Sequence, residues 1–215
     1  MHERLDRFLK QLNSHALIMG ILNLTPDSFS DGGKFNTLNA ALTQARRMKD
    51  EGAHVLDIGA ESTRPGHTPI SAEDEWARLE PLLKPLVDAV DIPFSIDTYK
   101  AEVARKSVAA GVSIINDIWG LQRDPAMADT VAETGAGVVI MHNRESVDPA
   151  LDIIDDMRRF FDISLQRAEK AGIPSTHIML DPGIGFGKDK AQNLAALRGL
   201  PALTGYGLPV LLGVS

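Results

Sequence analysis

Cysteine is absent from this chain of 215 residues, which excludes disulfide bonds, thiolate nucleophiles and cysteine-ligated zinc. Basic residues are outnumbered: 22 Lys and Arg against 29 Asp and Glu give a net charge of -7. No broad basic face is therefore expected for nucleic acid. No apolar run approaches a membrane span, and the opening MHERLDRFLKQLN is typical of a charged amphipathic helix, not of a signal peptide. We expect a cytoplasmic protein that binds neither nucleic acid nor membrane.

Hydrophobic residues make up 44% of the chain, enough for one sizeable core, and we expect one domain over residues 1–215. Short apolar runs alternate with helical segments, which is the pattern of parallel α/β folds. We predict seven strands near 16–22, 54–59, 93–97, 112–117, 137–141, 178–180 and 209–214. This predicts a (β/α)8 barrel of the TIM type without its last strand and flanking helices. A doubly wound open sheet is the alternative.

Polar residues follow most of the expected strands, and this favours the barrel, because an open sheet would concentrate them near one switch point. Asp97, Asn116 and Asp181 each end a strand. A carboxylate with a nearby amide suits a heterocycle that presents adjacent N–H and carbonyl groups. Alternatively, Asp97 and Asp181 cap a helix and a turn.

Two polar loops follow the first and second strands. Asn23 begins a Pro- and Gly-containing loop, where its carbonyl oxygen suits a hard cation, although such residues also build ordinary turns. In the second loop, Arg64 beside Thr63 is a good pair for phosphate oxygens, although a loop cation is more often only solvated.

Other polar candidates carry weaker signals. Glycines 183, 185 and 187 before Lys188 suggest a phosphate cradle, but their spacing fits neither a P-loop nor a dinucleotide fingerprint. His54, His67 and His142 lack the short spacing of zinc ligands. We interpret His54 as structural, whereas His142 follows the fifth strand and could line the pocket.

Five ordered motifs carry a resemblance along nearly the whole chain. They are MGILNLTPDSFSDGGKF (19–35), DIGAESTRPG (57–66), SIDTYK (95–100), IINDI (114–118) and LDPGIGFGK (180–188). The sequence resembles the dihydropteroate synthase family of folate biosynthesis, which sulfonamides inhibit. It departs from the family at Ala60, where Gly is usual, and at Ser215, where the chain stops.

The resemblance implies a role for several residues. The pterin is expected to contact Asp97, Asn116, Met141, Asp181 and Phe186, although a Met at position 141 is more often plain core and core packing of Phe186 is almost as likely. The pyrophosphate and 4-aminobenzoate are expected at Ser28, Phe29, Thr63, Arg64 and Pro65. Asn23 is expected to hold Mg²⁺, and Asp31, Asp97 and Asp181 to stabilise a cation that develops on the pterin.

The implied reaction displaces pyrophosphate from 6-hydroxymethyl-7,8-dihydropterin pyrophosphate by the amine of 4-aminobenzoate, giving 7,8-dihydropteroate. Loops 24–36 and 60–71 are expected to close over the site. The family's Lys after the seventh strand, and its Arg and His on the eighth, have no counterpart before Ser215. We therefore hypothesise a fragment of a longer enzyme, inactive or weakly active alone, that forms a homodimer when full length.

A pterin- or folate-binding barrel of a corrinoid methyltransferase, or a non-catalytic paralogue, is the alternative function. Those barrels share the Asp and Asn contacts to the pterin but lack the TPDSFSDGG and STRPG loops. The presence of both loops here favours the synthase.

Overall fold

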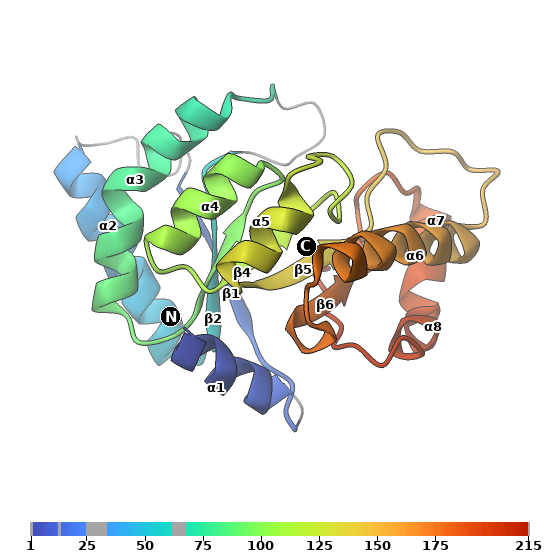
Figure 1. Ribbon diagram of the computed structural model, residues 1–215, viewed down its shortest axis with the longest axis horizontal. Helices are drawn as coiled ribbons and strands as arrows, with labels where there is room; N and C mark the ends of the chain where they lie inside the picture. The colour runs from blue at the N-terminus through green and yellow to red at the C-terminus, as the bar shows by residue number, and fades with distance from the viewer. Residues whose placement is uncertain (1, 13, 25–33, 62–67, 215) are drawn as a thin grey trace.

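The computed structural model describes residues 2–12, 14–24, 34–61 and 68–214 (Figure 1). Within these ranges six strands form one parallel sheet in the order β1-β2-β3-β4-β5-β6. The strands are β1 (Met19–Asn23), β2 (Val55–Gly59), β3 (Phe94–Asp97), β4 (Ile114–Asp117), β5 (Gly137–Met141) and β6 (Ile178–Asp181). Each strand pairs with the next in sequence, which is barrel order. A doubly wound sheet would reverse that order at a switch point, so the α/β barrel prediction is confirmed.

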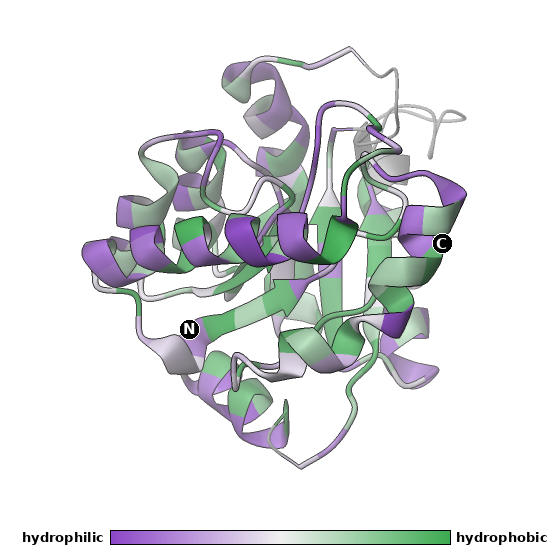
Figure 2. Ribbon diagram, turned by 90° about the vertical axis from the view of Figure 1, so that its right-hand side faces the viewer, coloured by the Kyte–Doolittle hydropathy of each residue, from purple (hydrophilic) through white to green (hydrophobic). Residues whose placement is uncertain are grey.

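Helices cover the outer face of the sheet, and each packs on the next in sequence from α2 to α7. In Figure 2 the mainly hydrophobic strands lie among helices that carry many hydrophilic residues. None of the helices in the described ranges is both long and apolar enough to cross a membrane. The helices are α1 (His2–Leu12), α2 (Lys34–Asp50), α3 (Ala72–Ala89), α4 (Ala101–Ala109), α5 (Met127–Thr134), α6 (Ile153–Ala171), α7 (Lys190–Arg198) and α8 (Leu200–Thr204), with a 3-10 turn, η2, at Ser175–His177.

Local sequence signals set the starts of several helices. The Ser71 side chain accepts a hydrogen bond from Asp74 N at 3.0 Å, which confirms the predicted start of α3. Asp152 caps α6 in the same way, by accepting from Ile154 N at 2.9 Å. These caps fix where each helix begins after the loop that follows the preceding strand.

The predicted seventh strand at 209–214 is not formed as a strand. Only Val210 makes a parallel bridge, to Leu180 of β6. Two backbone hydrogen bonds hold it, from Leu180 N to Pro209 O at 2.9 Å and from Leu211 N to Leu180 O at 2.8 Å. The apolar pattern identified the segment that lies beside β6, but the pairing stops after one bridge.

Alternate residues of each strand serve two different cores. Leu56 and Ile58 of β2 pack outward against the helices, whereas Val55 faces the barrel interior. That interior is filled at the amino end of the strands by Leu5 and Phe8 of α1, together with Ile114, Val139 and Met179. Helix α1, at the bottom of Figure 1, therefore closes one end of the barrel and leaves the other end for ligands.

Replacing Phe8 by Ala should lower the free energy of unfolding by about 3 kcal/mol or more, because Phe8 is 4% exposed and the truncation leaves a cavity. Asp6→Ala, on the exposed side of the same helix, is the control and should change stability little. Urea unfolding checks this. A loss below about 1 kcal/mol, the range of ordinary surface substitutions, would show that α1 does not seal the barrel.

Candidate functional site

The strand register brings the expected site residues to one end of the barrel. Asn23 is paired with Gly59, Asp97 with Asn116, and Met141 with Asp181. All are the last or nearly the last residues of parallel strands, so they share the edge opposite to α1. The structure therefore gathers these residues as the sequence predicts, while their roles stay predictions.

Asn23 and Asp97 approach each other over Gly59. A Cβ atom on Gly59 would lie 3.6 Å from both Asn23 Oδ1 and Asp97 Oδ2. Asn23 is exposed and Asp97 is half-buried, so both oxygens border the open end of the barrel. A larger residue than Gly59 would fill the space between them.

Asn116 is held by a carboxylate that the sequence analysis did not single out. Its Nδ2 donates to Asp57 Oδ2 at 3.0 Å, and the two residues are 8% and 5% exposed. Three buried oxygens nearby, Asn116 Oδ1, Asp57 Oδ1 and Asp97 Oδ1, have no protein partner. A cluster of unpaired acceptors suits a ligand rich in N–H donors, because unpaired buried acceptors are unfavourable.

Burial disfavours the charge of the carboxyl groups at this site. It raises the pKa of Asp97 well above its ordinary value, and the nearby Asp57 and Glu75 raise it further. Burial also raises the pKa of Asp57, while Ser95 and the hydrogen bond from Asn116 lower it. Burial raises the pKa of Asp181 to about 6, although Gly183 N–H and Lys188 act in the opposite direction. Burial therefore disfavours the ionised form of all three carboxyl groups, and a ligand that brings hydrogen-bond donors or positive charge would offset this.

The glycine loop after β6 is shaped by close backbone contacts, and the phosphate-cradle interpretation gains no support. Lys188 is 6% exposed, and its Nζ donates to Gly183 O at 2.7 Å and to Phe186 O at 3.1 Å. Burial lowers the pKa of Lys188 to about 8. Gly183 has φ +62°, and a Cβ there would lie 1.9 Å from His142 O. The loop thus packs tightly on the end of β5.

Three residues next to the site, Met141, Phe186 and His142, are buried or half-buried. Met141, 4% exposed, packs near Gly183, where an added Cβ would lie 3.3 Å from Met141 Cγ. Phe186 is half-buried, and its backbone N–H donates to Gly183 O at 3.1 Å. His142 is fully buried behind the rim, with Nε2 3.1 Å from Asp156 Oδ2. Burial lowers the pKa of His142 to about 4, so the imidazole is neutral at pH 7.

Several predicted site residues lie outside the described residues: Ser28, Phe29, Asp31, Thr63, Arg64, Pro65 and His67. Glu61, the last described residue before the second loop, is held by an ion pair and a hydrogen bond. Lys100 Nζ forms ion pairs with Glu61 and with Glu75, the latter at 2.5 Å. Tyr99 Oη also donates to Glu61, at 3.2 Å. This buried group ties the end of β2 to α3 and to the loop after β3.

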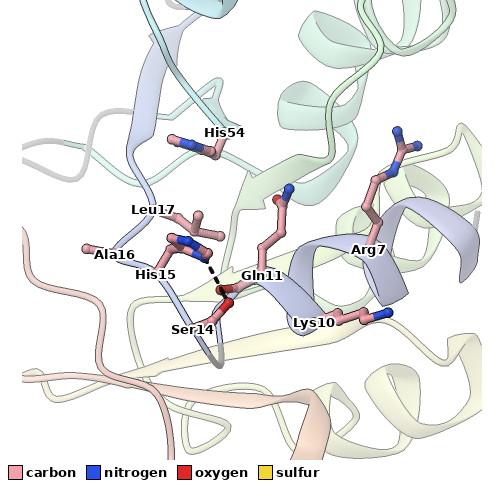
Figure 3. Close-up of a pocket in the computed structure, with 8 residues that line it drawn as sticks. All are labelled: Arg7, Lys10, Gln11, Ser14, His15, Ala16, Leu17 and His54. Atoms are coloured by element: carbon pink, nitrogen blue, oxygen red, sulfur yellow. Dashed lines mark hydrogen bonds between the residues drawn. The ribbon is translucent and has the colours of Figure 1, made fainter.

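A hollow of about 600 Å³ lies at the opposite end of the barrel, between α1 and the start of β2 (Figure 3). Arg7, Lys10 and His15 line it, and all three are exposed. His54 is there too, and its Nδ1 accepts from Ile18 N at 3.1 Å, a contact that supports its structural interpretation. None of the strand-end carboxyl and amide groups borders this hollow, so the candidate site is the other end.

The fold and the site define a class: a parallel α/β barrel with carboxylate and amide acceptors at the carboxyl ends of its strands. Residues 19–215 match the family described as pterin binding enzyme. The chain belongs to the pterin-binding enzyme family.

Curated and solved relatives of this chain are dihydropteroate synthases. The enzyme of Bacillus subtilis (strain 168) is 48% identical over 200 residues, which is 93% of this chain and 70% of that protein. The Clostridium difficile enzyme, solved in the presence of pteroic acid, has a TM-score of 0.90 at 47% identity and covers 94% of this chain and 77% of its own. The Xanthomonas albilineans enzyme, solved with 4-aminobenzoic acid, has a TM-score of 0.88 at 44% identity, with coverages of 94% and 74%.

Replacing Asp181 by Asn should stabilise the protein at neutral pH. A pKa raised from 3.8 to about 6 means that Asp181 favours folding below pH 3.8, and that this benefit is lost as the pH rises through about 6. The Asn side chain keeps an acceptor for Gly183 N. The free energy of unfolding of D181N should therefore match that of the wild type near pH 4 and exceed it above pH 6.5 by about 3 kcal/mol.

Thermal unfolding at several pH values measures this difference. Asp162→Asn, at an exposed position of α6, is the control and should give no pH-dependent gain. A D181N variant that is less stable than the wild type at pH 7 would show that Asp181 stabilises the fold as an ion.

Proposed function

We propose that this chain is a dihydropteroate synthase, which condenses 6-hydroxymethyl-7,8-dihydropterin pyrophosphate with 4-aminobenzoate to give 7,8-dihydropteroate and pyrophosphate. The observation that carries the proposal is the gathering of Asp97, Asn116 and Asp181 at the open end of the barrel, with buried acceptor oxygens that have no protein partner. Membership of the pterin-binding family and the ligands named for its relatives support it.

The acceptors match the hydrogen-bonding edge of a pterin. A pyrimidinone ring carries ring N–H and amino donors side by side, and Asn116 Oδ1 and Asp97 Oδ1 are acceptors close to one another. Met141 supplies an apolar surface at the end of β5, between these groups and Asp181. A flat ring held in this way would direct its 6-hydroxymethyl substituent toward the loops that follow β1 and β2.

The chemistry then follows from the charge of the site. The bond from the methylene carbon to the pyrophosphate oxygen breaks, and its electron pair leaves with the anion. The lone pair of the aromatic amine forms the new C–N bond, and the amine releases a proton. The amine is a weak nucleophile, so positive charge accumulates on the pterin before the amine attacks. The ends of β3 and β6 bring Asp97 and Asp181 to the barrel mouth, where their carboxylates would stabilise that charge.

Mg²⁺ fits the oxygen donors at the end of β1. Asn23 Oδ1 would hold the ion together with pyrophosphate oxygens, since Mg²⁺ commonly uses one or two protein ligands and completes its shell with water and phosphate. Among the described residues no group of three or more His, Cys, Asp or Glu side chains could hold a metal ion by itself. When bound, Mg²⁺ would supply positive charge to the departing pyrophosphate.

Removing Mg²⁺ with EDTA should weaken binding of the pterin pyrophosphate by about tenfold or more, as expected when one partner of a charge-assisted contact is lost. Binding of 6-hydroxymethylpterin, which has no phosphate, should not change. Asn23→Ala should reproduce this selective loss, and calorimetric titration with the two ligands measures both. Equal weakening for both ligands would contradict a metal role for Asn23.

In the full-length enzyme, Asp97→Asn should lower kcat/KM for dihydropteroate formation by about 100-fold, which corresponds to losing one preorganised charge of roughly 3 kcal/mol. Asp162→Asn, far from the barrel mouth, is the matched control and should keep wild-type activity. A chain that binds the pterin pyrophosphate but ignores 4-aminobenzoate would instead be a pterin carrier, and this result would overturn the proposed synthase.

We also propose that the full-length protein forms a homodimer. Sedimentation or light scattering of the full-length protein would test this separately from activity.

A further inference from the structure

We propose that Asp57 is a positioning residue: its carboxylate fixes the orientation of the Asn116 amide, so that Asn116 presents an acceptor and not a donor to the pterin. This inference rests on the proposed function. Asp57 itself need not touch the ligand.

Asp57 occupies an unusual place inside β2. It lies between Leu56 and Ile58, both fully buried in the outer core, and shares the inward-facing side of the strand with Val55 and Gly59. A charged residue in the middle of an apolar strand must have a partner or a purpose, since it is rarely buried otherwise. The hydrogen bond from Asn116 Nδ2, at 3.0 Å, reaches Asp57 across strand β3, which separates β2 from β4 in the sheet.

The direction of the hydrogen bond follows from chemistry. An ionised carboxylate can only accept, so the amide of Asn116 must turn its NH2 group toward Asp57. Asn116 Oδ1 is then the amide atom that does not contact Asp57, and it is buried with no protein partner. Without Asp57 the amide could rotate by half a turn and place its NH2 group in the mouth, where it would meet the donors of the pterin edge.

A buried carboxylate at position 57 is unfavourable for stability, and this also indicates that Asp57 has a functional role. Burial raises its pKa, and Asp57 in turn raises the pKa of both Asp97 and Asp181. Three carboxyl groups around one opening disfavour each other's charge, so an apolar residue at position 57 would favour stability. Retaining a carboxylate there is expected if it serves the ligand rather than the fold.

A double-mutant cycle in the full-length protein tests the inference, with 6-hydroxymethylpterin as the probe in calorimetric titrations. Asp57→Ala should weaken binding by about tenfold, and Asn116→Ala by a similar or larger factor, each as expected for loss of a buried hydrogen bond to a ligand. In the double variant, the loss should not exceed that of Asn116→Ala alone by more than about twofold, because Asp57 acts only through Asn116.

Asp57→Asn removes the charge and keeps one acceptor. Its Oδ1 can still accept from Asn116 Nδ2, but its NH2 group can instead donate to Asn116 Oδ1, so binding should fall between that of the wild type and that of Asp57→Ala. Asp117→Asn is the matched control: Asp117 is a buried carboxyl on the same strand as Asn116, but it accepts from Trp119 N and Leu121 N instead. This control should bind 6-hydroxymethylpterin as the wild type does.

The ¹⁵N signal of the Asn116 side-chain amide gives a second readout without ligand. Relative to the wild type, it should move toward solvent-exposed values in Asp57→Ala. Should the alanine variant fold poorly, Asp57→Leu provides the same loss of the acceptor with more volume.

Two results would overturn the inference alone while the wild type binds the probe: losses that add in the double variant, or Asp57→Asn as weak as Asp57→Ala. The latter would mean that the charge of Asp57, and not its orienting effect, matters. A full-length wild type that does not bind the probe would overturn the proposed function, and the inference with it.

Discussion

Strands β1 to β6 run in one direction and pair in sequence order, so the six carboxyl ends meet at the same edge of the sheet. Side chains alternate along each strand, and the inward-facing residues therefore form successive layers inside the barrel. The lower layer is apolar and is closed by Leu5 and Phe8 of α1. The upper layer carries Asp97, Asn116 and Asp181. One geometric constraint thus provides both a sealed core and an open polar rim.

Stability and ligand binding oppose each other at this rim. The carboxyl groups of Asp57, Asp97 and Asp181 are desolvated by the strands that hold them, and each has a raised pKa. Such groups weaken the ionised fold and strengthen the attraction for a ligand that brings donors or positive charge. The close packing of the glycine loop against His142, with Lys188 fixed on backbone carbonyls, keeps Asp181 in place.

The alternation of apolar runs and helical segments predicted most strands and helices to within a few residues, because short buried strands and capped helices leave local signals. It did not predict α8, whose five residues are too few for a helical period, and it overestimated pairing after Pro209. Residues that end strands were found from sequence because polar residues there break an apolar run. Asp57 was missed as a site residue because it lies within such a run, and only the fold brings it to Asn116.

The most direct measurement is a crystal structure of this chain with 6-hydroxymethylpterin bound. We expect the pyrimidinone edge to lie within hydrogen-bond distance of Asp97, Asn116 and Asp181, with Asn116 Oδ1 accepting from the ring and Nδ2 still donating to Asp57. A pterin found at the α1 end of the barrel beside Arg7 and His54, or an Asn116 amide that donates to the ligand, would contradict it.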